Sequence, residues 1–446
     1  MNPPISRNDY KIAIICALPV EAAAVGALFD DTPGQSSETP THGKAAGDTN
    51  AYMTGRIAQH HVILAFMPEM GKAAAAGVAA SLRSSYPQLK LAVVLGVCGG
   101  VPKTPSGQEI FLGDVVVSSG IIQYDFGRLY PAGFIRKESL THSLHRPGVE
   151  IRAVIAKLKA QQLSGSLQSQ IAVHLEALRR DPRSRAFAAY PGAAEDRLFD
   201  AGYPHGHGRV GGCAICSSAS GEICSAAQRS SCEELDCDER ALVGRQRRSG
   251  ENDTEQPQQP MVHFGLVASG DTLMRSGLNR DMIASKEKVI AFEMEGAGAW
   301  DILPCVLIKG ISDYADSHKN KKWQGYASTT AAACLKAFLG QWTLDAQPSS
   351  LEGEESRPGG GSGPSSDGIW IGASTQSSVV AATLTNDGGI NLRNRRDSPR
   401  ANENDPSVPR TAPMGRSKSS HAVEIEKDVT GSVVANTLTN RGGINL

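Results

Sequence analysis

The sequence of 446 residues contains no apolar run long enough to cross a bilayer, and its first nine residues lack the apolar core of a signal peptide. Aromatic residues make up only 5% of the chain, and the formal net charge is −1. Without an excess charge of one sign, the chain has no electrostatic basis for attracting nucleic acid or a membrane surface. These absences predict a soluble cytoplasmic protein with no membrane span and no nucleic-acid partner.

The cysteine pattern argues against a disulfide framework. Nine cysteines are an odd number in a chain without a secretory signal, so we expect free thiols. Five of them crowd into residues 213–237, in a polar segment with two histidines upstream. We expect no bound metal and a flexible, thiol-containing loop; in the alternative, a structural zinc site, the candidate ligands are Cys213, Cys216, Cys232 and Cys237.

Familiar nucleotide-binding and hydrolase motifs are also missing. The segment Gly96-Val-Cys-Gly-Gly-Val101 does not match the dinucleotide fingerprint, and Gly71-Lys72 lacks the glycine-rich lead of a P-loop. There is no Gly-x-Ser-x-Gly elbow. What the sequence does offer is a set of carboxylates at the ends of predicted strands.

Short apolar runs alternate with helical patterns through the chain. Strands are predicted at residues 11–18, 61–67, 91–95, 114–119, 262–268 and 304–308, and helical patterns at 20–29, 72–86, 147–180 and 326–339. This alternation predicts an α/β fold of three layers around a central mixed, largely parallel sheet. Ligands of such sheets bind at the carboxyl ends of the strands.

Composition divides the chain into a globular part and a tail. Periodicity is lost at 181–260, which we interpret as a low-order surface insertion. A Gly-, Ser- and Pro-rich linker follows the globular part, and the tail contains one sequence twice. The predicted boundaries are 9–342 for the globular domain, 343–373 for the linker, 374–446 for the tail, and 378–392 and 432–446 for its two repeats.

Three acids lie where they could share a site: Glu21, Glu295 and Asp313. Glycosidic cleavage passes through an oxocarbenium-like transition state and needs a protonated leaving group and an activated nucleophile. Carboxylates can supply both. The plainer interpretation is that each acid caps a helix or orders a loop.

Eight motifs occur in an order that resembles the nucleoside phosphorylase and nucleosidase superfamily over residues 9–342, especially its fungal branch attached to signalling proteins. The motifs are Ile-Cys-Ala-Leu-Pro-Val-Glu21, Glu-Met-Gly-Lys72, Leu-Gly-Val-Cys-Gly-Gly100, Leu-Gly-Asp-Val-Val-Val117, Gln-Tyr-Asp-Phe-Gly127, Ala-Ser-Gly-Asp271, Phe-Glu-Met-Glu295 and Gly-Ile-Ser-Asp-Tyr-Ala-Asp316. The resemblance implies a nucleoside phosphorylase-like fold.

It also implies residue roles. Asp313, oriented by Ser312, would protonate the purine as the bond breaks, and Glu295 would bind the ribose hydroxyls. The substrate-binding residues implied are Glu293, Met294, Glu295, Leu273, Met274, Gly96, Cys98 and Gly99. Because active sites in this superfamily lie near subunit contacts, a homo-oligomer is expected.

Glu21 bears on the type of reaction. Hydrolytic members carry a glutamate here as general base for water, whereas phosphorolytic members carry phosphate-binding Gly and Arg residues. The resemblance therefore implies hydrolysis of the N-glycosidic bond of a purine nucleoside or nucleotide, with no cofactor. One alternative is a salvage phosphorylase that uses inorganic phosphate, and another is a non-catalytic nucleoside-binding sensor. Candidate phosphate-binding residues are Lys72, Arg128 and Arg275, each otherwise a solvated surface charge.

The tail repeats predict strand, turn and strand, because apolar residues alternate on both sides of an Asn-x-Gly-Gly turn. In the first copy these residues are Val380, Ala382, Leu384, Ile390 and Leu392. Stacked in register, the copies would place Asp387 opposite Arg441. The tail resembles the paired motifs of fungal prion-forming domains. This implies an effector in signalling or programmed cell death, triggered when the tail assembles on an NLR-type receptor; the alternative is a recent duplication in a disordered tail.

Overall fold

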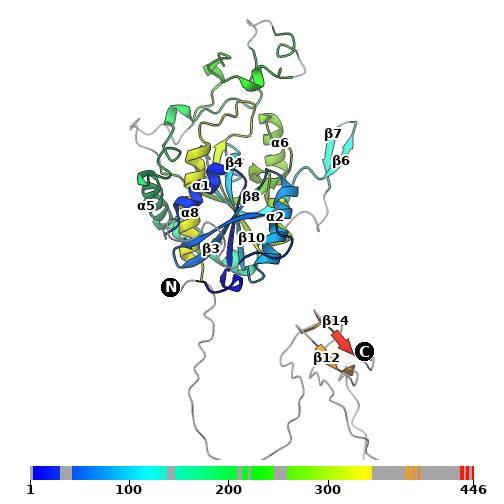
Figure 1. Cartoon of the computed structure of the whole chain (residues 1–446). Coiled ribbons are helices and arrows are strands. Elements are labelled where there is room, and N and C mark those ends of the chain that lie inside the picture. Colours follow the sequence, from blue (N-terminus) through cyan, green and yellow to red (C-terminus); the bar gives the residue numbers. More distant parts are fainter. Residues whose placement is uncertain are drawn as a thin grey trace, which may run out of the picture. The chain divides into compact units, whose positions relative to one another are not determined.

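The computed structural model describes residues 4–30, 43–131, 133–137, 146–207, 213–218, 222–245 and 259–343, together with six short strands between 378 and 445. The chain divides into two compact units, residues 1–345 and 346–446. Helices cover the sheet of the first unit, with α1, α5 and α8 on one side and α2 and α6 on the other in Figure 1. No described helix has the length and apolarity that a membrane crossing needs.

The first unit is built on an eight-stranded sheet. Its strands are β1 (Ile12–Cys16), β2 (Ala51–Ile57), β3 (His60–Phe66), β4 (Leu91–Gly100), β5 (Val115–Gln123), β8 (Val262–Ser269), β9 (Val289–Glu293) and β10 (Cys305–Asp313). Five pairings are parallel, namely β1–β3, β1–β4, β4–β10, β5–β8 and β8–β9. Three are antiparallel, namely β2–β3, β5–β10 and β4–β9. The predicted α/β fold around a mixed, largely parallel sheet is confirmed.

Five of these strands close into a ring. β10 pairs with β4 on one side and with β5 on the other, and β5, β8, β9 and β4 continue the circuit. The first half of β4 contacts β1, whereas Gly99 and Gly100 at its end contact β9. All five residues of β1 and all nine of β10 are buried, as their apolar runs predict.

Helices pack on the ring of strands and on β1, β3 and β2, which continue the sheet beyond β4. They are α1 (Pro19–Ala27), α2 (Lys72–Ser85), α4 (Val149–Leu163), α5 (Ser166–Arg180), α6 (Gly277–Glu287), α7 (Gly296–Trp300) and α8 (Gln324–Gln341). α8 contacts β4, β5 and β10 and also α1, α4 and α5, which makes it the central helix of its layer. The helical pattern predicted at 147–180 forms two helices, because Gly165 adopts a left-handed conformation with φ +74° between them.

The insertion is more ordered than the sequence analysis expected. Its described residues contain only short 3₁₀ turns, η2 (Ala193–Glu195), η4 (Ala227–Arg229) and η5 (Glu239–Ala241). They nevertheless share a small buried core of Phe199, Ala227, Leu235 and Cys237. A second, exposed hairpin of the first unit, β6 (Gly127–Tyr130) and β7 (Gly133–Arg136), projects on the side of α2 and α6 in Figure 1.

The second unit contributes three strand pairs. β11 (Ser378–Ala381) pairs with β14 (Ser432–Ala435), β12 (Leu384–Asn386) with β15 (Leu438–Asn440), and β13 (Ile390–Asn391) with β16 (Ile444–Asn445). All three pairs are parallel and join identical residues, such as Val379 with Val433 and Asn386 with Asn440. The predicted pair Asp387 and Arg441 and the linker beyond residue 343 lie outside the described residues.

Candidate active site

The carboxyl ends of β4, β9 and β10 converge on one pocket. Asp313 at the end of β10 is in register with Gly99 of β4, and Gly99 is in register with Phe292 of β9. The predicted site residues that line the pocket are Gly99, Leu273, Met274, Glu293, Met294 and Asp313. Tyr124 and Lys319 line it as well. Six of the residues that the sequence analysis named as site candidates therefore lie around a single opening.

Three contacts hold the carboxylate of Asp313 in this pocket. Ser312 Oγ donates a hydrogen bond to its Oδ2 at 2.9 Å, and the backbone N–H of Ala315 donates to its Oδ1 at 3.0 Å. Lys319 Nζ forms an ion pair with Oδ2 at 2.8 Å. Since Asp313 is only 4% exposed, these contacts fix the direction in which its carboxyl group faces the pocket.

Two further glutamates share one buried lysine. Glu295 Oε2 lies 2.8 Å from Lys309 Nζ, and Glu293 Oε2 lies 3.6 Å from it. Glu293 also accepts backbone N–H groups of Glu295 and Gly296. Burial raises the pKa of Glu293, with Lys309 opposing the rise. Burial disfavours the charged form of Lys309, but Glu295 and Glu293 outweigh it and raise the pKa of Lys309 above its ordinary value.

Glu21 lies beside this cluster but does not line the pocket. Its Oε2 accepts the backbone N–H groups of Ala17 and Leu18 at 2.9 and 2.8 Å, and its Oε1 accepts that of Val97 at 2.8 Å. A Cβ at position 96 would lie 2.2 Å from Oε1, so only glycine fits there. Burial raises the pKa of Glu21, and Lys309 opposes that rise.

Cys98 supports the site without facing it. The side chain is buried, and Ser312 Oγ donates to the Cys98 carbonyl at 3.4 Å. Burial raises the pKa of the Cys98 thiol, so the neutral form is favoured.

The three candidate phosphate-binding residues are not gathered at the pocket. Lys72 Nζ contacts both carboxylate oxygens of Asp125 at 2.7 and 2.8 Å and lies 3.6 Å from Asp271. Arg128 is exposed on β6, and Arg275 is exposed before α6. None of the three lines the pocket that contains Asp313.

A family profile matches the N-terminal part of the first unit. Residues 11–168 match the profile of the phosphorylase superfamily, so this part of the chain is similar to that superfamily. Strands β1 and β4 lie inside the matched range, whereas β9 and β10, which carry Glu293 and Asp313, follow it.

Two curated relatives match over part of their length. An NLR-like protein of Hyaloscypha variabilis is 31% identical over 344 residues, which cover 76% of this chain and 30% of that protein. The aminodeoxyfutalosine nucleosidase of Helicobacter pylori is 31% identical over 83 residues, which cover 17% of this chain and 36% of the enzyme. The chain therefore spans about a third of the length of these relatives.

Solved structures match over most of their own chains. The futalosine hydrolase of Helicobacter pylori strain 26695 is 16% identical, with 74% of this chain and 98% of that chain covered and a TM-score of 0.42. The 5'-methylthioadenosine/S-adenosylhomocysteine nucleosidase of S. pneumoniae is 20% identical, with the same coverage and TM-score.

Sequence reasoning missed two cations of the first unit, Lys309 and Lys319. Lys309 had a signal: it directly follows the apolar run 304–308, and a lysine in a buried strand requires a charged partner. Lys319 had no such signal, since it lies in a polar segment and reaches Asp313 only through the turn after β10.

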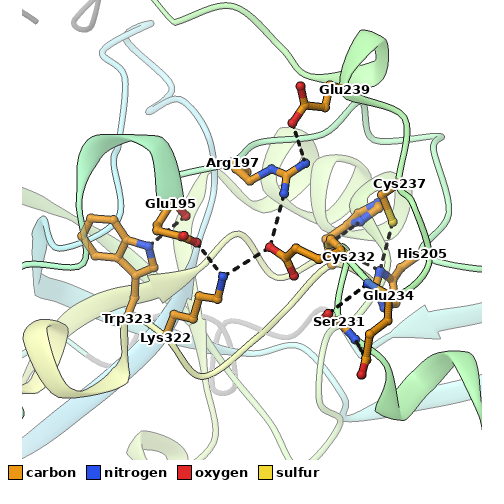
Figure 2. A network of polar contacts seen from close by, with 12 residues as sticks. Glu195, Arg197, His205, Ser231, Cys232, Glu234, Cys237, Glu239, Lys322 and Trp323 are labelled. Carbon is orange, nitrogen blue, oxygen red and sulfur yellow. Dashed lines mark hydrogen bonds and ion pairs between the residues drawn. The ribbon is translucent and has the colours of Figure 1, made fainter.

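The four cysteines named as candidate ligands of the alternative zinc site are divided between two clusters in the structure. Cys213 and Cys216 lie with His207 and Cys224, whereas Cys232 and Cys237 lie with His205 and His318. In Figure 2, Cys232 and Cys237 face His205 beside the ion pairs of the insertion. The reason is that His205 and His207, two residues apart, contribute to different clusters, and His318 comes from beyond the insertion.

Proposed function

We propose that the chain hydrolyses the N-glycosidic bond of a purine nucleoside or nucleotide. The observation that carries this proposal is the arrangement of Asp313, Glu293 and Met294 around one pocket. A carboxyl group oriented by Ser312 can donate a proton to a departing base, and a carboxylate and a thioether at the end of β9 are suited to a sugar.

The charges around the pocket support hydrolysis over phosphorolysis. Three buried glutamates, Glu21, Glu293 and Glu295, surround the single ammonium group of Lys309. An excess of negative charge stabilises an oxocarbenium-like transition state and repels a phosphate anion. Lys72 and Lys319 are already paired with carboxylates, which makes them poor phosphate ligands.

Glu21 is the proposed general base for the attacking water. Its raised pKa brings it closer to neutral pH, where general bases are effective. A carboxylate offers about four acceptor positions, and three backbone N–H groups occupy part of that capacity. The remaining acceptor position would hold the water.

We further propose that the enzyme is an effector in signalling. A relative that is 31% identical to this chain is named an NLR-like protein. In the tail of this chain, the strands pair identical residues of the two repeats in parallel. Parallel in-register pairing is the geometry by which one copy can template another. On this proposal the protein is cytoplasmic and homo-oligomeric, an NLR-type receptor engages the tail, and assembly of the tail raises the rate of cleavage.

The test is release of free base by the full chain from a panel of purine nucleosides and nucleotides, with and without phosphate. We expect release without phosphate, lost in Asp313→Asn and Glu21→Gln and retained in Asp301→Asn, whose carboxylate is exposed after α7. Release only in the presence of phosphate would assign a phosphorylase. Binding of nucleoside without release would assign a sensor.

A further inference from the structure

We propose that the insertion binds two zinc ions, one of which fastens it to the turn that carries Asp316 and Lys319. The ligands form two sets. The inner set is His205, Cys232, Cys237 and His318, and the outer set is His207, Cys213, Cys216 and Cys224. Within each set, the four ligand atoms all lie within 4.8 Å of one another.

The distances fit a tetrahedral ion at the centre of each set. With zinc about 2.3 Å from sulfur and about 2.1 Å from nitrogen, a tetrahedral angle separates the two ligand atoms by about 3.6 Å. In the inner set, Cys232 Sγ lies 3.6 Å from both His205 Nδ1 and His318 Nδ1, and Cys237 Sγ lies 3.5 Å from His205 Nδ1. In the outer set, His207 Nδ1 lies 3.6 Å from Cys216 Sγ and 3.5 Å from Cys224 Sγ.

Hydrogen bonding alone does not account for these contacts. A ring nitrogen without a proton has one lone pair and accepts one thiol. His205 Nδ1 nevertheless faces both Cys232 and Cys237, and His207 Nδ1 faces both Cys216 and Cys224. Several ligand atoms directed at one point are expected when a cation occupies that point.

The surroundings orient the ligands as a metal requires. Nε2–H of His205 donates to the Ser230 carbonyl at 2.9 Å, and that of His318 donates to the Tyr203 carbonyl at 3.1 Å. Each bond fixes the tautomer that leaves Nδ1 free to coordinate, which is the usual arrangement around metal-bound histidine. Backbone N–H groups of Cys224 and Ala227 donate to the sulfurs of Cys216 and Cys224 at 3.5 and 3.4 Å, which stabilises thiolates.

The chemistry of the ligands selects zinc. Thiolates and imidazoles prefer zinc to magnesium or calcium, and four protein ligands with no open position are typical of a structural site. By contrast, Cys305 and Cys334 lie in the apolar core of the first unit, where a thiol serves as a small hydrophobic side chain.

The inner set joins the insertion to the active-site turn. His318 lies five residues beyond Asp313, and its neighbour Lys319 pairs with that aspartate. The backbone N–H of His205 donates to Ser317 Oγ at 3.0 Å, on the residue before His318. Ion pairs of Lys322 with Glu195 and Glu233 lie beside the inner set, as Figure 2 shows in part.

Metal content of the purified full chain, measured by mass spectrometry, tests the proposal. We expect two zinc ions per chain, one after Cys237→Ser, one after Cys216→Ser and none after both changes. Cys334→Ala is the matched control, since it removes a buried thiol outside both sets, and should retain two. Loss of zinc from Cys237→Ser but not from Cys216→Ser would overturn the outer site.

A second measurement avoids the folding of variants. Wild-type protein stripped with a chelator and titrated with cobalt(II) should develop the visible absorption of tetrahedral, thiolate-bound cobalt, saturating at two equivalents. The thiols of the stripped wild-type protein should also react more slowly with a thiol-modifying reagent after zinc is added than before. The proposal would be overturned if the native protein contained no more zinc than the double variant and gave no tetrahedral cobalt spectrum. That result would not bear on whether the protein releases free base.

Discussion

Replacing Lys309 by methionine tests whether the buried glutamates depend on one cation. Lys309 and Glu295 are both buried, so removing the ammonium group leaves Glu295 and Glu293 without their counter-charge. At an effective dielectric constant of about 20, ion pairs at 2.8 and 3.6 Å correspond to gross attractions of about 6 and about 5 kcal/mol. Desolvation offsets much of this, and losing one partner of a buried pair costs about 3–5 kcal/mol.

The assay is urea unfolding of the full chain at neutral pH. We expect Lys309→Met to lower the free energy of unfolding by about 3–5 kcal/mol. Lys309→Met combined with Glu295→Gln should be more stable than Lys309→Met alone, because the second change removes one uncompensated charge. The control is Lys336→Met, which breaks a partly exposed ion pair with Asp30 and should cost about 1 kcal/mol or less. Equal losses in Lys309→Met and Lys336→Met would refute the reasoning.

Three further predictions follow from single contacts. Asp313→Asn should lower the rate of base release by about 10²–10⁴, measured by coupled base detection, with urea unfolding used to show that the variant is folded. An unchanged rate would remove this group from the chemistry. Gly96→Ala should push aside the Glu21 carboxylate and lower the rate of base release by about 100-fold. The control is Gly77→Ala, in open space on α2, which should leave that rate unchanged and raise the free energy of unfolding by about 0.5–1 kcal/mol. Equal rates of base release in the two variants would contradict this reasoning. Burial lowers the pKa of His60, whose Nε2 contacts two carbonyls at the end of α8. Its contribution to stability is therefore present above the ordinary pKa of about 6.5 and is lost as the pH falls through the lower folded-state value. His60→Gln should flatten the decline of unfolding free energy below about pH 6.5, and an unchanged slope would count against a neutral buried ring.

Local pattern predicted six of the eight strands of the large sheet, but it did not predict β2 or β9. The apolar runs of β1 and β10 predict buried strands, and the residues that follow them therefore lie at the ligand-binding edge. Asp313 could be placed at that edge on this ground, whereas Glu293 ends β9, a strand that was not predicted. The contacts of Glu293 with Lys309 and of Asp313 with Lys319 could not be predicted, because they depend on how the side chains pack and on the turn after β10.

The ring and the cysteine clusters depend on long-range geometry. The sequence of β10 does not indicate that this strand pairs with both β4 and β5. Which strands become its neighbours depends on how the helices and the rest of the sheet pack around it. The same holds for the inner set, which joins Cys232 to a histidine 86 positions later. Spacing between neighbouring cysteines therefore suggested one set where the fold forms two.

The strand ring has a consequence for synthesis of the chain. Its members β4, β5, β8 and β9 all precede β10 in the sequence, and β10 is the strand that separates β4 from β5. In a nascent chain that ends before residue 305, β4 and β5 are already synthesised but β10 is not. The edges of β4 and β5 that pair with β10 therefore stay exposed. Non-local pairing of this kind is slow and prone to aggregation. We therefore expect the ring to close only after Asp313 has been synthesised, and fragments that stop earlier to aggregate more readily.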